Sequence, residues 1–286
     1  MEIITSVTTM QRWSREVHRQ GQTVAFVPTM GYLHEGHLAL IRAAQTAGDK
    51  VVVSLFVNPT QFGPQEDFAH YPRDRARDEA LCRDADVAAC FIPATEEMYA
   101  PDHQIYMEEP AAARLLEGAH RPGHFRGVLT VVAKLFGAVQ PDVAVFGEKD
   151  AQQLWLVEKL VADLNFPVRI MAHPTVREPD GLAMSSRNKY LQPAQRERAT
   201  CLYRALQVAA QKVAAGETRA AVVLESMQPV LATVPEARID YVALVDPGTF
   251  RPLEQEVSTP CRAVLAVRIG STRLIDTMLL SAGNET

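Results

Sequence analysis

The sequence predicts an α/β protein in which a mostly parallel sheet carries helices on both faces, followed by a smaller α+β domain. Over about the first 175 residues, apolar strand-like runs alternate with helix-like segments, as in successive β-α-β units. Beyond about residue 176 the alternation stops, and two helix-like segments precede closely spaced strand-like runs. We therefore expect two domains, residues 1–176 and residues 177–286.

The elements of the first domain follow from local patterns taken in order. Alternating charges with a few apolar anchors predict a surface helix over residues 11–20. Continuous β-branched runs such as residues 51–57 are typical of strands buried on both faces. On this basis we expect strands at 24–27, 51–57, 86–93, 143–147 and 168–171, and helices after residue 37 and at 73–83, 127–139 and 151–164.

In the second domain the pattern predicts helices first and strands afterwards. A polar loop at residues 184–188 precedes one long helix expected from about 193 to 215 and another from about 219 to 231. Apolar runs then predict strands at 239–245, 262–269 and 272–277.

Composition narrows the functional classes. A net charge of −5 argues against a nucleic-acid partner, because such binding usually needs a basic face. No apolar run of 18 residues predicts a membrane span, and the first residues lack the pattern of a secretory signal, so we expect a cytoplasmic protein. The cysteines, Cys82, Cys90, Cys201 and Cys261, are scattered without a Cys-x-x-Cys pair and are expected to be buried free thiols.

The strongest motif is His34-Glu35-Gly36-His37, at the point where the first strand gives way to a helix. A helix start carries unpaired N–H groups and partial positive charge, which suit a phosphate. At Gly36 the missing side chain lets a planar group lie against the backbone while His34 and His37 donate to phosphate oxygens. Two ordinary surface histidines are the simpler alternative. Zinc fits less well, because metalloprotease histidines are four apart and no third ligand is evident.

Further loops are expected at the carboxyl ends of the parallel strands, where α/β sheets bind ligands. Lys149 follows one strand and is well placed for phosphate oxygens, although residues 147–150 also fit a plain turn with Asp150 as helix cap. Ser185, Ser186 and Arg187 would add hydroxyl and guanidinium donors for a triphosphate, or form an ordinary polar turn.

Two amides suggest a second ligand. If Gln61 and Gln153 face an apolar pocket, they provide the donors and acceptors that suit a small hydroxy acid; otherwise they are surface amides. The expected pocket residues are Met30, Phe56, Phe62 and Val131. The basic loop at residues 121–127 either contacts an anion or only leads into a helix.

These motifs, in this order, resemble the pantothenate synthetase family. The matching segments are residues 27–31, 33–37, 56–62, 71–73, 121–125, 146–154 and 180–188, and residues 270–276 also fit. One departure is Thr60, where the family commonly has Met, a change that would slightly reshape the pocket wall.

The resemblance implies a Rossmann-like nucleotidyltransferase domain related to class I aminoacyl-tRNA synthetases, a C-terminal lid and a cytoplasmic homodimer. It also implies that pantoate and ATP form pantoyl adenylate and pyrophosphate, after which β-alanine displaces AMP to give pantothenate. Mg²⁺ is expected to arrive on the ATP phosphates, because no acidic cluster dedicated to a metal stands out.

The resemblance assigns site residues by position. His34, His37, Lys149 and Arg187 would act in catalysis, with His37 usually written as proton donor. Gln61 and Gln153 would bind pantoate, and Gln61 would also lie near β-alanine. The residues implied for ATP are Met30, Gly31, Tyr32, Leu33, His34, Glu35, Gly36, His37, Gly147, Glu148, Lys149, Asp150, Val176, Met184, Ser185, Ser186 and Arg187.

Two rival functions remain at this stage. A nucleotidyltransferase that moves AMP or CMP onto a phosphate-bearing acceptor would share the histidine motif but would not need Gln61 and Gln153. A non-catalytic ATP-binding protein would have no use for two separate cationic loops. A dehydrogenase is disfavoured, because no Gly-x-Gly-x-x-Gly follows the first strand.

Overall fold

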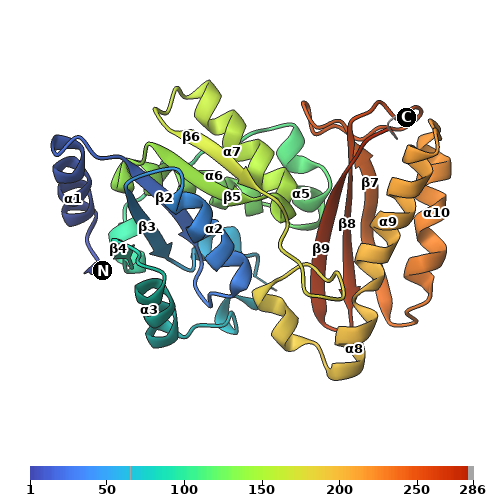
Figure 1. Ribbon diagram of the computed structural model, residues 1–286, viewed down its shortest axis with the longest axis horizontal. Helices are drawn as coiled ribbons and strands as arrows, with labels where there is room; N and C mark the ends of the chain where they lie inside the picture. The colour runs from blue at the N-terminus through green and yellow to red at the C-terminus, as the bar shows by residue number, and fades with distance from the viewer. Residues whose placement is uncertain (65, 283–286) are drawn as a thin grey trace. The chain divides into compact units, whose positions relative to one another are not determined.

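A computed structural model of the chain describes residues 1–64 and 66–282, and the chain forms two compact units (Figure 1). The first unit comprises Met1–Gly147 and Gln153–Pro174, and the second comprises Glu148–Gln152 and Thr175–Thr286. In the part of the chain that is described, no helix has the length and apolar character needed to cross a membrane.

The first unit is built on a six-stranded parallel sheet, as the alternating pattern predicts. Its strand order is β1-β4-β3-β2-β5-β6. The strands are β1 (Glu2–Ile4), β2 (Val24–Thr29), β3 (Lys50–Leu55), β4 (Ala89–Phe91), β5 (Val143–Gly147) and β6 (Arg169–His173). The sequence did not indicate β1, since three residues are too few to show a period.

Strand β2 lies at the centre, and the chain moves outward from it in both directions. It pairs with β3 on one side and with β5 on the other. In open α/β sheets the ligand crevice lies at such a switch point, outside the carboxyl ends of the strands. The ends of β2 at Thr29 and of β5 at Gly147 therefore mark the expected site.

Helices cover both faces of this sheet, which confirms the predicted layers. Side chains that alternate along β2 enter two separate cores: Phe26 packs in the core that includes α6, and Val27 packs in the core that includes α2. The helices of the unit are α1 (Val7–Arg19), α2 (Glu35–Gln45), α3 (Arg75–Asp84), α4 (Thr95–Met98), α5 (Glu117–His120), α6 (His124–Val139) and α7 (Ala151–Asp163), with short 3₁₀ segments η1 (Pro59–Gln61), η2 (Asp67–Ala69) and η3 (Ala112–Arg114). The 3₁₀ segment η4 (Glu148–Asp150) and the first two residues of α7 belong to the second unit.

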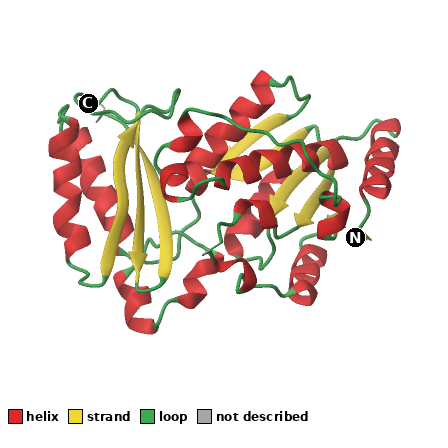
Figure 2. Cartoon of the chain, turned by 180° about the vertical axis from the view of Figure 1, so that it is seen from behind, coloured by secondary structure: helices red, strands yellow, loops and turns green. Residues whose placement is uncertain are grey.

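The second unit is an antiparallel sheet with helices packed against it (Figure 2). Its strands, in the order β7-β8-β9, are β7 (Ala237–Val245), β8 (Cys261–Ile269) and β9 (Thr272–Leu280). Its helices are α8 (Pro193–Arg198), α9 (Cys201–Ala214) and α10 (Ala220–Ala232), and a 3₁₀ segment η5 (Ser186–Tyr190) precedes them. Leu202, Leu206 and Met227 of the helices share a core with Leu265 and Val267 of β8.

The expectation of one unbroken helix from 193 to 215 is wrong, because the chain forms α8 and α9 with Ala199 and Thr200 between them. At this point the Thr200 hydroxyl donates to the Glu197 carbonyl at 2.8 Å, and Leu202 N–H bonds the Ala199 carbonyl, three residues back. A threonine that bonds nearby backbone competes with the regular helix ladder.

The four cysteines are buried free thiols, as predicted. Burial raises the pKa of Cys201 and of Cys261 to about 11, so both stay protonated at neutral pH.

Candidate active site

The loop between β2 and α2 makes a tight left-handed turn before the histidine motif. Gly31 has φ +80° and Tyr32 has φ +51°. Glycine adopts such a conformation readily, whereas a tyrosine does so only when its surroundings hold it there. The turn directs the chain from the end of the central strand into the helix that His34 begins.

His34 and His37 cap the start of α2 reciprocally. The Nδ1 atom of His34 accepts the Gly36 N–H at 3.1 Å, and the Nδ1 atom of His37 accepts the His34 N–H at 3.3 Å. The ring centroids are 4.1 Å apart. The prediction that both histidines lie at a helix start is therefore confirmed. Because Nδ1 accepts in each ring, a neutral ring carries its proton on Nε2, and each histidine can donate from that atom.

Two backbone amides of this loop bond a carboxylate of the protein itself. The Tyr32 N–H and the Leu33 N–H donate to the carboxylate of Asp78, on α3, at 2.6 Å and 2.7 Å. Sequence reasoning did not single out Asp78, and its position within a charge-rich helix offered no signal. The assignment of Tyr32 and Leu33 to ATP stays a prediction.

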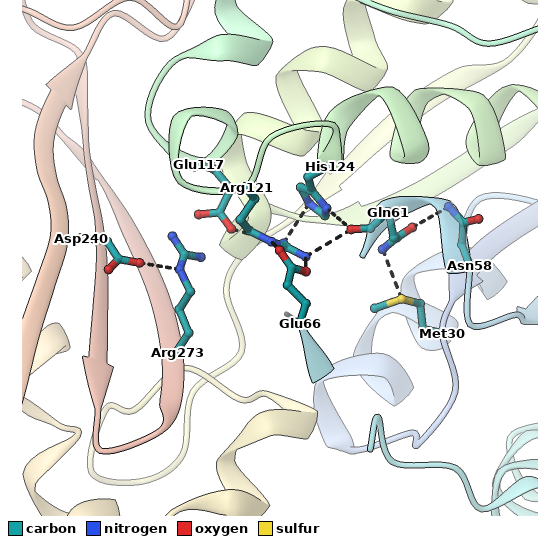
Figure 3. A network of polar contacts seen from close by, with 9 residues as sticks. All are labelled: Met30, Asn58, Gln61, Glu66, Glu117, Arg121, His124, Asp240 and Arg273. Carbon is teal, nitrogen blue, oxygen red and sulfur yellow. Dashed lines mark hydrogen bonds and ion pairs between the residues drawn. The ribbon is translucent and has the colours of Figure 1, made fainter. Parts of the chain in front are cut away.

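Gln61 is a buried amide, and it lies beside Met30 as the pocket hypothesis expected (Figure 3). Its Nε2 donates to the Met30 sulfur at 3.2 Å, and its Oε1 accepts from Asn58 Nδ2 at 3.0 Å. Asn58 is 1% exposed and also accepts from the Tyr99 hydroxyl at 2.9 Å. The sequence placed Asn58 in the loop after a strand, within the family-like segment 56–62, but gave it no role. Its signal was an Asn-Pro pair at a strand's carboxyl end, three residues before a glutamine.

The basic loop at residues 121–127 supports Gln61 through buried groups (Figure 3). The Arg121 guanidinium forms a two-pronged pair with Glu66, at 2.9 and 2.7 Å, and reaches Glu117 at 3.3 Å. His124 donates from Nδ1 to the Gln61 carbonyl at 2.9 Å, and its Nε2 accepts from Arg121 at 3.0 Å. Both carboxylates thus balance the arginine within the protein, so this loop positions η1.

His124 is held neutral by its surroundings. Burial, reinforced by the nearby charge of Arg121, lowers the pKa of His124 to about 4. A neutral ring has one donor and one acceptor nitrogen, which is what the two observed partners require.

The residues assigned to ATP fall in both units. Met30 to His37 and Gly147 belong to the first unit, and the remaining ones belong to the second. Met184 N–H bonds the Val176 carbonyl at 3.0 Å, which brings these two predicted residues together. Ser185 caps η5 by accepting the Arg187 N–H at 3.3 Å. Glu148 accepts from the Arg262 guanidinium at 3.2 and 3.3 Å, so this predicted residue has a partner within its own unit.

A buried ion pair holds the segment just before Met184. Arg177 donates to both oxygens of Asp276, at 2.7 and 3.0 Å, and its guanidinium lies 4.3 Å from the Tyr203 ring centroid. Burial raises the pKa of Asp276, and the charges of Arg177 and then Lys149 oppose that rise.

Gln153 is half-buried on α7, in the first unit. No structural contact tests its assignment to pantoate, which stays a prediction.

Several side chains assigned to ATP suit phosphate oxygens. The imidazole, amine, hydroxyl and guanidinium groups of His34, His37, Lys149, Ser185, Ser186 and Arg187 can donate hydrogen bonds, whereas the carboxylates of Glu35, Glu148 and Asp150 accept them. Across residues 1–64 and 66–282, no group of three or more His, Cys, Asp or Glu side chains could hold a metal ion.

Together these features define an α/β protein with a capped His-x-Gly-His helix start at the switch point of a parallel sheet, joined to a small antiparallel unit. The chain matches the model of the pantoate-beta-alanine ligase family over residues 2–279, and it belongs to that family. It is thus a ligase of pantothenate biosynthesis that joins pantoate and β-alanine. The suspected resemblance is confirmed.

Known relatives match along nearly the whole chain. A pantothenate synthetase from Moorella thermoacetica is 50% identical over 284 residues, which cover 99% of this chain and 100% of the relative. The crystal structure of pantothenate synthetase from Thermus thermophilus is 46% identical with a TM-score of 0.92, covering 98% of this chain and 99% of that one. A pantoate-beta-alanine ligase from Francisella tularensis, solved in complex with beta-gamma ATP and beta-alanine, is 34% identical with a TM-score of 0.80, covering 98% and 97%.

The lowered pKa of His124 predicts a pH dependence of stability. Between the pKa of an unfolded histidine, about 6.5, and the folded value of about 4, the unfolded chain binds more protons than the folded one. The free energy of unfolding should therefore fall as the pH drops through this window, by about 3 kcal/mol from this group. Urea titrations of the wild type and His124→Gln between pH 7.5 and 4.5 test this. An equal slope in both proteins would contradict it.

Proposed function

We propose that the protein makes pantothenate from pantoate, β-alanine and ATP through a pantoyl-adenylate intermediate. The observation that carries the proposal is the reciprocal cap of His34 and His37, which places two Nε2 donors at a helix start beside the switch point. The Francisella tularensis ligase that was solved with beta-gamma ATP and beta-alanine supports ATP as the second substrate.

The proposed reaction has two displacements. A pantoate carboxylate oxygen attacks the α-phosphorus of ATP, a P–O bond forms, and the bond to the leaving pyrophosphate breaks. The β-alanine amine then attacks the acyl carbon of the mixed anhydride, an amide bond forms, AMP leaves with the electron pair, and the amine loses a proton. Neither step needs a protein nucleophile, so binding, orientation and charge stabilisation account for the catalysis.

In the first displacement, the protein must stabilise charge that moves onto pyrophosphate. We assign His34 and His37 as neutral donors through Nε2, because each Nδ1 already accepts a backbone N–H. Lys149 and Arg187 would supply positive charge, and Mg²⁺ on the phosphates would neutralise more of it. On this assignment the histidines act mainly as hydrogen-bond donors, and His37 is not required as a general acid.

Gln61 is assigned to bind pantoate, and the orientation of its amide decides which atom can do so. Asn58 donates to Gln61 Oε1, which leaves Gln61 Nε2 as the donor toward substrate oxygens next to Met30. A buried amide in an apolar wall discriminates well between a hydroxy acid and an analogue without the hydroxyl. Gln153 is assigned as the second pantoate-binding amide. Most residues assigned to ATP, pantoate and catalysis lie in residues 1–176. Residues 177–286, which include Met184 to Arg187, are assigned the role of a lid.

The adenylate step has a direct test. With pantoate labelled by ¹⁸O in its carboxylate, ATP, Mg²⁺ and β-alanine, we expect pantothenate, pyrophosphate and AMP that carries one ¹⁸O, because the carboxylate oxygen stays on phosphorus when the amide forms. Mass spectrometry of AMP reads this out. Formation of ADP and phosphate, or of AMP without label, would exclude the adenylate route. A rival that only transfers a nucleotide to a phosphate-bearing acceptor would give no pantothenate.

The donor role of the capping histidine can be separated from its structural role. In His34→Asn the side-chain oxygen can still accept the Gly36 N–H and cap α2, but the Nε2 donor is lost. We expect kcat to fall by about 10²–10³-fold, the typical effect of losing one preorganised donor, with an almost unchanged melting temperature. Lys149→Met should lower kcat comparably. A marked loss of melting temperature with normal turnover would instead show that these residues are structural.

We also propose that the protein is a homodimer. Three large apolar side chains of the first unit are exposed near one another in sequence: Ile105 at 73%, and Tyr106 and Leu115 at 36% each. Such exposure is costly in a monomer and is relieved when a second copy covers it. Sedimentation equilibrium should give about twice the chain mass of 31.6 kDa, and Ile105→Asp should shift the protein toward the monomer. A wild-type protein of single-chain mass at micromolar concentration would contradict the proposal.

A further inference from the structure

Asp78 lies on α3, outside every set of residues assigned to a substrate, yet it binds the loop that carries the histidines. The side chain is buried, at 2% exposure. Its Oδ2 accepts the Tyr32 N–H at 2.6 Å, and its Oδ1 accepts the Leu33 N–H at 2.7 Å. Both oxygens of one carboxylate are thus used by two consecutive amides, immediately before His34.

The bonds to Asp78 hold the loop in a backbone conformation that is unfavourable without them. Tyr32 has φ +51°, a left-handed conformation that costs a residue with a Cβ atom about 1 kcal/mol or more. Gly31 precedes it at φ +80°, and a Cβ atom added there would lie 3.0 Å from Asp78 Oδ2. The loop and the carboxylate are therefore packed closely, with glycine at the point of nearest approach.

The neighbouring residue of α3 holds the other side of the same peptide segment. Arg77 Nη1 donates to the Leu33 carbonyl at 2.8 Å, and the guanidinium lies 5.4 Å from the Tyr32 ring centroid. The Leu33 side chain is itself fully buried. Leu33 is thus fixed through its N–H, its carbonyl and its side chain, and the residue that follows it is the helix-capping His34.

Burying the Asp78 carboxylate carries a desolvation penalty, so stability alone does not explain its presence. Burial raises the pKa of Asp78, and the bonds from Leu33 and Tyr32 and the charge of Arg77 oppose that rise only in part. An apolar side chain of similar size would fill the space without the desolvation penalty, but it could not bond two amides. What the carboxylate adds is one defined loop conformation.

We propose that Asp78 is a positioning residue for the reaction: by bonding the Tyr32 and Leu33 amides, it fixes the turn that places His34 and His37 against the phosphates of ATP. The proposal rests on the proposed role of these histidines. Asp78 acts through them and does not touch the substrate. Since the histidine donors matter most where charge develops, a displaced loop should lower kcat more than it weakens ATP binding.

The main test is Asp78→Asn, which keeps one acceptor oxygen but turns an NH₂ group toward the other amide. We expect kcat to fall by about 10- to 100-fold, because a shift of about 1 Å in a catalytic group has effects of that size. The KM for β-alanine should change by less than about twofold, because the histidines serve the first displacement. If the folded variant keeps its wild-type kcat and only loses melting temperature, Asp78 is structural and the proposal is overturned.

A double-mutant cycle shows whether Asp78 works through the capping histidine. If it does, Asp78→Asn combined with His34→Asn should be little slower than His34→Asn alone, since the donor that Asp78 places is already missing. If the fold-losses of kcat in the two single variants multiply in the double variant, the two residues act independently and the proposal is overturned.

A matched control lies one turn away on the same helix. Asp74 is exposed and caps α3 by accepting the Arg77 N–H at 3.1 Å. Asp74→Ala should cost about 1 kcal/mol of stability through the lost cap, while kcat stays within about twofold of the wild type. If Asp74→Ala lowers kcat as much as Asp78→Asn does, loss of α3 stability explains both effects and the proposal is overturned.

Two further measurements keep the outcome decisive. Amide hydrogen exchange needs no substrate: Tyr32 and Leu33 should exchange at least about 10-fold faster in Asp78→Asn, with Phe26 of β2 unchanged. Unchanged exchange at both amides would overturn the proposed role of Asp78, whatever the enzyme catalyses. Failure of the wild-type enzyme to form an adenylate would instead refute the proposed function, so the two failures can be told apart. If Asp78→Asn does not fold, Arg77→Met is the alternative variant, because it removes the exposed donor to the Leu33 carbonyl. It should also lower kcat, and its effect should be less than additive with that of His34→Asn. An unchanged kcat in Arg77→Met would overturn the proposal.

Discussion

The reciprocal cap at the start of α2 is the interaction on which the candidate site depends. Each histidine gives its Nδ1 lone pair to a backbone N–H that would otherwise lack a partner within the helix. Protonating either ring at Nδ1 would break that bond and expose an amide at the helix start. When a ring is neutral, the bonds that begin the helix therefore place its proton on Nε2, so the helix cap also decides which ring nitrogen can donate to a ligand.

A backbone partner also decides the tautomer of His124, and there it selects the opposite one. There the partner is a carbonyl, that of Gln61, so the proton lies on Nδ1 and Nε2 accepts from Arg121. In both places a backbone partner decides the state of the ring. The positive charge of Arg121, which donates to His124, is balanced by Glu66 and Glu117.

Sequence patterns predicted the main elements well and failed where local signals were short or ambiguous. Alternating apolar runs located β2, β3 and β5, since a strand buried on both faces leaves a continuous signal. The edge strand β1 was missed because three residues show no period. The break between α8 and α9 was missed because Thr200 is compatible with a helix in sequence and interrupts it only through a bond of its side chain.

The order of motifs was enough to place the chain in its family. The sequence also put His34 and His37 at a helix start, because a strand that ends at Pro and Gly and the apolar period of the helix that follows are local signals. The partners that hold those motifs in place came only from the folded chain. Asp78 lies 45 residues from Leu33, and Glu66 lies 55 residues from Arg121. Contacts of this kind follow from how α3 and the start of η2 pack in three dimensions, and neither hydrophobic period nor turn chemistry carries that information.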